Sequence, residues 1–172
     1  MTTPIHLSKK LEKLYLKHIK FDKFIFEPFL GKWNANLFYV DRKKCWLITN
    51  AETKFSLIIP DLKTSEIINF TDIFIENFYS QLIYENIIVD FNLLKNWTGN
   101  IELLTTDNDR KTIGTQNYIL DTMEYWKHEF GNFQNMPFRE LIRRMNSSPT
   151  KAFNWKTPRE IILAKINTIA QQ

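Results

Sequence analysis

This sequence has few residues that cross-link a chain or interrupt its regular structure. Among its 172 residues there are one cysteine, four glycines and six prolines. The single cysteine, Cys45, excludes an intrachain disulfide and is typical of a reducing compartment. Because glycine and proline are scarce and no repeat or low-complexity tract occurs, no segment has the composition of a linker. We therefore expect one continuously packed domain over residues 1–172.

Long apolar runs are also missing. A membrane-spanning helix needs about 20 mostly apolar residues, whereas the densest apolar run, FSLIIP at residues 55–60, has the length of a strand. The N-terminal sequence MTTPIHLSKK lacks the apolar stretch of a signal peptide. We therefore expect a cytoplasmic protein that makes no membrane contact.

The common catalytic motifs do not occur in the chain. There is no P-loop, no glycine-rich dinucleotide loop and no G-x-S-x-G elbow. The three histidines are scattered, and the pair Glu124 and His128 would need a third ligand from elsewhere to hold a metal. The sequence thus predicts no cofactor and no metal, and it favours a binding protein over a conventional hydrolase, kinase or dehydrogenase.

Charge is present but unevenly distributed. Residues 1–54 carry a net charge of +6, residues 55–109 one of −7, and residues 110–172 one of +5. One interpretation is that the two basic segments meet in the fold and form a surface for a polyanion. The other is that basic and acidic segments face each other, or another subunit, as ordinary solvated faces.

The spacing of apolar residues predicts strands and helices in turn. Period-two alternation predicts strands over residues 33–40, 45–50 and 54–60, and their short connections require antiparallel pairing. A fourth strand is predicted over residues 100–106. Helices are predicted after Ser8 and over residues 72–86, 91–97, 114–130, 137–146 and 157–166. Together these elements predict an α+β domain, in which an antiparallel β-meander sheet of about four to five strands is covered by helices.

Two predicted loops each place an aspartate beside an arginine. Asp41-Arg42 follows the first predicted strand, and Asp109-Arg110 follows the fourth. If these strands lie side by side, both loops open at one edge of the sheet. We then expect Arg42 and Arg110 to line a common polar site with Asn36 and Asn117. The alternative is that the Asp–Arg pairs only stabilise the conformations of their loops, since the planar guanidinium group suits both roles.

Two separated motifs resemble an uncharacterised bacterial domain family. Its members carry a W-x-A-N-L…D-R-x-x-C strand pair, matched here by WNANLFYVDRKKC at residues 33–45. They also carry a T-x-D-R-x-x-x-G-x-x-N loop, whose part from D-R onward is matched by DRKTIGTQN at residues 109–117. Further matches are Asn146 and Pro149 in MNSSP, and Trp155 and Pro158 in WKTP. The resemblance implies a domain that occurs alone or beside passenger proteins of mobile elements and has no established activity.

Three classes of function remain. The leading prediction is a non-catalytic module that binds nucleic acid or another phosphate-bearing partner through the basic segments. The second is a protein-interaction subunit of a mobile-element or defence system, with the acidic middle as its interface. The third is an enzyme with a site around Arg42 and Arg110. The candidate binding residues are Trp33, Asn36, Asp41, Arg42, Asp109, Arg110, Asn117, Arg139, Arg143 and Arg144.

Overall fold

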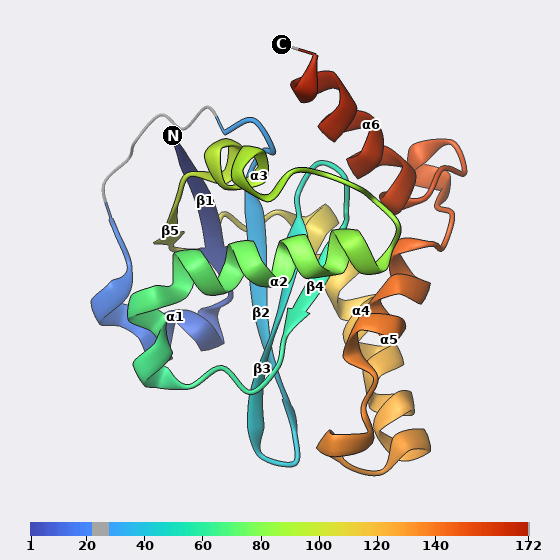
Figure 1. Cartoon of the computed structure of the whole chain (residues 1–172). Helices are drawn as coiled ribbons and strands as arrows, with labels where there is room; N and C mark the ends of the chain where they lie inside the picture. Colours follow the sequence, from blue (N-terminus) through green and yellow to red (C-terminus); the bar gives the residue numbers. More distant parts are fainter. Residues whose placement is uncertain (22–27, 172) are drawn as a thin grey trace.

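A computed structural model describes residues 1–21 and 28–171, which form one five-stranded sheet with helices on both faces (Figure 1). The strands are β1 (Thr2–Leu7), β2 (Trp33–Val40), β3 (Lys43–Asn50), β4 (Ser56–Ile59) and β5 (Asn100–Leu104). The α-helices are α1 (Lys9–Tyr15), α2 (Phe70–Tyr84), α3 (Phe91–Thr98), α4 (Arg110–Phe130), α5 (Phe138–Asn146) and α6 (Pro158–Ala170). Short 3-10 turns η1 to η4 lie at Leu16–His18, Thr64–Asn69, Phe133–Asn135 and Lys151–Phe153. Among these described helices, none is both long enough and apolar enough to cross a membrane.

The sheet is mixed, so the prediction of a purely antiparallel meander is only partly right. Its order is β4-β3-β2-β1-β5. The antiparallel pairing of β2, β3 and β4 is confirmed, and so is the broader α+β class. However, β1 lies between β2 and β5 and runs parallel to both. Sequence reasoning missed β1 because TTPIHL contains Pro4, which disfavours an inner strand, and because its residues are buried on both faces rather than in alternation.

A separate hydrophobic core lies between each face of the sheet and the helices that pack on it. Residues Trp33, Ala35 and Leu37 of β2 point to the first core, where α1, α2, α3 and α6 pack. Phe38 and Val40 point to the second core, under α4 and α5. This is the alternation that the sequence predicts for this strand, and it fixes which of its residues can reach solvent or a ligand.

The residues that begin α4 decide where the helix lies. The carboxylate of Asp109 accepts hydrogen bonds from the backbone N–H groups of Lys111 and Thr112, each at 3.1 Å, and so caps the helix. The helix therefore starts at Arg110, four residues before the predicted start at Gly114. This extra turn brings Lys111 and Thr115 beside the turn between β3 and β4.

Candidate functional site

The two Asp–Arg loops do not lie at one edge of the sheet. Asp109 caps the N-terminus of α4, whereas Asp41 accepts a hydrogen bond from the backbone N–H of Phe133, beyond the C-terminus of that helix. The 21 residues of α4 correspond to about 30 Å of helix. The hypothesis that Arg42 and Arg110 share a site is therefore wrong, because Ile5 of β1 pairs with both Trp33 and Leu103. The start of β2 thus lies level with the end of β5, and β2 carries Asp41 and Arg42 a whole strand length away from Arg110. Both arginines are exposed and lie far apart.

The remaining candidate residues are also dispersed. Trp33 is 0% exposed and packs edge-on against Phe74 and Phe78 in the first core, so its side chain is closed to a ligand. Asn117 is exposed on α4. On α5, Arg139 is exposed; on the same helix, Arg143 and Arg144 both donate to Glu140.

The basic segments at the two ends of the chain do not gather on a single surface, although Lys54 of the first lies close to Lys111 of the second. Helix α1 carries the basic N-terminal segment and lies beside β1 and β2, at the left in Figure 1. Helices α5 and α6 carry the basic C-terminal segment and lie at the right, beyond β4. This arrangement favours the second interpretation of the charge pattern, in which the segments form ordinary solvated faces.

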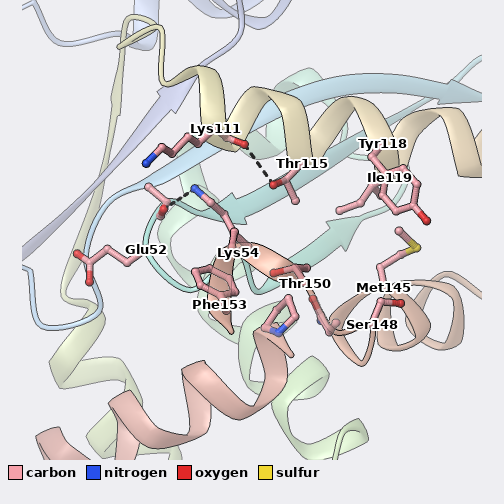
Figure 2. Close-up of a pocket in the computed structure, with 14 residues that line it drawn as sticks. Glu52, Lys54, Lys111, Thr115, Tyr118, Ile119, Met145, Ser148, Thr150 and Phe153 are labelled. Atoms are coloured by element: carbon pink, nitrogen blue, oxygen red, sulfur yellow. Dashed lines mark hydrogen bonds between the residues drawn. The ribbon is translucent and has the colours of Figure 1, made fainter. Parts of the chain in front are cut away.

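A pocket of about 660 Å³, here called the large pocket, opens beside the N-terminal half of α4 (Figure 2). Its walls are the turn between β3 and β4, the first turns of α4, the end of α5 and the segment that leads into α6. A volume of this size is in the usual range for small-molecule sites, which are mostly apolar with a few converging polar groups. The lining residues are Ala51, Glu52, Lys54, Lys111, Thr115, Tyr118, Ile119, Met145, Asn146, Ser148, Thr150, Ala152, Phe153 and Pro158.

One end of the large pocket is polar and carries net positive charge. Figure 2 shows Glu52, Lys54 and Lys111 together at this end. Glu52 is bound by Lys165 of α6, so its charge is already balanced. The ammonium group of Lys54 donates to the backbone carbonyl of Ala51 at 2.6 Å and to the hydroxyl of Thr112 at 2.7 Å. Burial lowers the pKa of Lys54, although the nearby Asp109 carboxylate acts in the opposite direction.

The turn between β3 and β4 holds Lys54 in this position. The backbone of Lys54 has a φ of 59°, in the left-handed region. Asn50 stabilises the turn, because its side-chain oxygen accepts from the N–H groups of Glu52 and Thr53 and its side-chain nitrogen donates to the carbonyl of Leu30 at 2.7 Å. The hydrogen bonds of the buried Asn50 therefore stabilise the turn in which the backbone of Lys54 takes this conformation.

The other end of the large pocket is apolar and aromatic. Tyr118, Ile119 and Met145 lie together there, and Phe153 and Thr150 form the wall between the two ends (Figure 2). Tyr118 is 65% exposed, so its ring is available at the mouth. The hydroxyl oxygen of Thr150 is buried and has no hydrogen-bond partner among the described residues. The pocket thus combines apolar and aromatic side chains with the Thr150 hydroxyl group, which makes no hydrogen bond to the described residues.

A buried polar cluster behind the pocket attaches it to the sheet. The side chain of Asn146 accepts from the N–H of Ser56 at 2.8 Å and donates to its carbonyl at 2.9 Å, so it pairs with the start of β4 as a neighbouring strand would. Asn146 and Gln81 also donate to one oxygen of Glu85, each at 2.7 Å. Glu85 is 1% exposed, its other oxygen has no partner among the described residues, and burial raises its pKa to about 7. Arg159, at the start of α6, donates to the backbone carbonyl of Glu85.

Sequence reasoning missed most of this site. Asn146 and Pro158 belong to the MNSSP and WKTP matches, so those motifs were the available signal. Nothing in the local sequence indicates that Lys54 and Lys111, more than fifty residues apart, lie at one end of a pocket. Within residues 1–21 and 28–171, no three His, Cys, Asp or Glu side chains are grouped so that they could hold a metal ion.

Comparisons with known proteins identify a family but no characterised relative. Neither curated proteins nor solved structures gave a match. A family model described as "Domain of unknown function (DUF6933)" matches residues 4–161, which is most of the chain. An uncharacterised family is what the sequence motifs indicated. The chain therefore belongs to the DUF6933 family, a domain of unknown function.

Proposed function

We propose that the protein is a non-catalytic binding module whose large pocket takes a small phosphate-bearing ligand with a planar or apolar body. A nucleotide is the class that combines these two parts. The observation that carries the proposal is the division of the large pocket into a cationic end and an aromatic end (Figure 2).

The charges at the polar end support an anionic ligand. Three lysines, at positions 54, 111 and 165, lie there with the carboxylates of Glu52 and Asp109. Glu52 is paired with Lys165, and Asp109 is occupied as the cap of α4. Lys111 is exposed and makes no ion pair among the described residues. A phosphate group at this end would gain charge-assisted hydrogen bonds from Lys111 and from the partly buried Lys54.

The aromatic end supports a ring-shaped body. Tyr118 lies at this end and Phe153 between the two ends, so aromatic rings line two walls of the pocket, and Met145 adds an adaptable apolar contact. Stacking of a base on an aromatic side chain contributes about 1–3 kcal/mol. Aromatic contacts of this kind recognise the ring in general and do not depend on one particular base.

The test is calorimetric titration at low salt with a nucleoside monophosphate, with the nucleoside alone and with inorganic phosphate alone. We expect the complete nucleotide to bind more tightly than either part. The K111E variant should weaken the nucleotide about tenfold, equal to about 1.4 kcal/mol, and leave the nucleoside unchanged, while F153A should weaken both. K10E, on the remote helix α1, is the matched control. Failure of all three compounds to bind at low salt would refute the proposal.

A second candidate function, a protein-interaction subunit, is favoured by one observation on the acidic segment. Ile68 is 80% exposed and Ile88 is 89% exposed, on either side of helix α2. Ile68 precedes α2 and Ile88 follows it, so a partner that lies along this helix would bury both side chains. Size-exclusion chromatography of the wild type and of an I68S/I88S variant, each mixed with products of neighbouring genes, tests it. A complex that forms equally well with both proteins would contradict this surface.

A further inference from the structure

A small recess lies on the other flank of α4, separate from the large pocket. Lys111 and Thr115 of this helix line the large pocket, whereas Ile113 and Gln116 line the recess. The remaining walls come from the carboxyl ends of β1 and β5 and from the start of β2. In sheets with parallel strands, ligands commonly bind outside the carboxyl ends of the strands. The volume of the recess is about 180 Å³, close to the roughly 150 Å³ that accommodates a benzene ring in an engineered protein cavity.

We propose that this recess is a second binding site, which takes a small uncharged ring that carries hydroxyl or amide groups. The proposal does not depend on the function proposed for the large pocket, because the two hollows share only the helix between them.

The first support is an unpartnered amide oxygen in the wall of the recess. Asn34 is 4% exposed. Its Nδ2 donates to Asp107 Oδ1 at 2.8 Å, which determines the orientation of the amide, and its Oδ1 has no partner among the described residues. A buried acceptor without a partner costs about 1–3 kcal/mol. A ligand that donates an N–H or O–H group to this oxygen would remove that cost.

The second support is an unused hydroxyl in the same recess. Ser8 precedes α1 at the position where a serine side chain normally caps the helix, but its hydroxyl makes no capping hydrogen bond. Its Oγ is buried and has no partner in the part of the chain that the structure describes. Two of the residues that line this small hollow therefore each carry a buried polar atom without a partner among the described residues.

The third support is that the recess is already shaped and has little net charge. Gln116 donates to the backbone carbonyl of Asn34 at 2.8 Å, and the Oδ1 of Asn36 accepts from the next backbone N–H at 2.9 Å, so both amides are held in place. The nearby carboxylates are occupied. Asp107 binds Lys32 at 2.5 Å, and Glu12 accepts from the backbone N–H of Thr106 at 2.5 Å. The positive charge of Lys9, which also lines the recess, offsets the negative charge of Glu12, so the net charge is small and the geometry favours a neutral ligand over a phosphate or a metal ion.

The test uses two ring probes and nitrogen-15 NMR. Uracil represents amide-bearing rings and glucose represents hydroxyl-bearing rings, and each is titrated into the labelled full-length chain. We expect one probe to give saturable shifts in the side-chain amides of Asn34, Asn36 and Gln116, and the active probe identifies the class. The S8A variant should bind about three- to tenfold more weakly, as expected for one lost hydrogen bond. Its melting temperature should be unchanged, because the hydroxyl makes no bond within the protein.

The controls separate this site from the large pocket and from solvent. S65A, a change of the same kind at an exposed serine, should have no effect on either probe. F153A, which removes a ring that lines the large pocket and not the recess, should leave probe binding intact. The proposal is overturned if neither probe gives saturable shifts, or if both S8A and N36A bind as tightly as the wild type. It is also overturned if crystals soaked in the probes show ordered waters retained on Asn34 Oδ1 and Ser8 Oγ.

Discussion

Replacing Glu85 with glutamine should remove a pH-dependent penalty on folding. Burial raises the pKa of this carboxyl group from 4.5 to about 7, although hydrogen bonds from Asn146 and Gln81 and the charges of Arg159 and Arg143 act in the opposite direction. In the unfolded chain the group titrates at its ordinary value. The folded state therefore binds the proton more tightly, so the unfolding free energy decreases as the pH rises.

The magnitude follows from the two pKa values. A difference of one pKa unit is worth about 1.4 kcal/mol. For a group that titrates at 4.5 in the unfolded chain and at about 7 in the folded protein, the effect is about 3 kcal/mol. This stabilising contribution is fully present below pH 4.5, is lost progressively as the pH approaches 7, and changes no further above that value.

Urea unfolding of the wild type and of E85Q, followed from pH 4.5 to pH 8.5, measures the effect. Glutamine does not titrate, so the unfolding free energy of E85Q relative to the wild type should rise by about 3 kcal/mol across this range. A constant offset between the two proteins is compatible with the reasoning, because the new amide changes the contacts with Gln81 and Asn146. Only the pH dependence of the difference is predicted.

The control is E140Q. Glu140 has a pKa lowered to about 2, with the hydrogen bond from Arg143 as the largest cause, so its ionisation is complete before the range begins. At pH 4.5 only the unfolded chain, where the group titrates at its ordinary value, still binds protons, so the offset of E140Q from the wild type should change by no more than about 0.4 kcal/mol between pH 4.5 and pH 8.5. A constant offset for E85Q as well, or a carbon-13 titration of Glu85 with a midpoint near 4.5, would refute the argument from burial.

Three further substitutions test other parts of the fold. N146A should lower the unfolding free energy by about 3 kcal/mol, since it leaves the N–H and carbonyl of Ser56 without a partner and removes one of the two hydrogen bonds to the Glu85 carboxylate, whereas N117A at an exposed position should change it by less than about 0.5 kcal/mol; equal effects would contradict the role of Asn146. G31A should cost about 1–2 kcal/mol, because Gly31 has a φ of 78° and an added Cβ would overlap the Glu52 carboxylate; thermal melting that shows no loss would disprove it. R42G should raise the unfolding free energy by up to about 1 kcal/mol, because Arg42 has a φ of 64°; a decrease would mean that its side chain makes a stabilising contact.

Local patterns in the sequence predicted the parts of the fold that depend on near neighbours. The alternation in WNANLFYV predicted the two faces of β2, and the short connections predicted the antiparallel order of β2, β3 and β4. The helix predicted over residues 157–166 is confirmed as α6, and its start is a local feature, a capping box in which Glu160 accepts from the N–H of Thr157 at 2.7 Å. These features are set within a few residues, by side-chain period, turn length and capping.

The site depended on distant neighbours and could not be predicted in the same way. The pairing of Arg42 with Arg110 assumed that β5 lies beside the meander, and the insertion of β1 into the sheet removed that adjacency. The order of the strands in a sheet depends on which apolar faces can be buried together, and the residue pattern of a single strand does not predict it. The same limit applies to Lys54 and Lys111, which meet because α4 lies across the second face of the sheet. It applies also to Ser8 and Asn34, which meet because β1 pairs in parallel with β2.

The amino-acid sequence by itself determined an α+β domain with an antiparallel hairpin system, an uneven charge distribution and a chain without common catalytic motifs. Only the tertiary structure decided that the sheet is mixed, that the basic ends lie apart, and that the hollows flank α4. The physical reason is that strand period and helix capping are short-range effects, whereas the position of a pocket results from packing several remote segments into two cores.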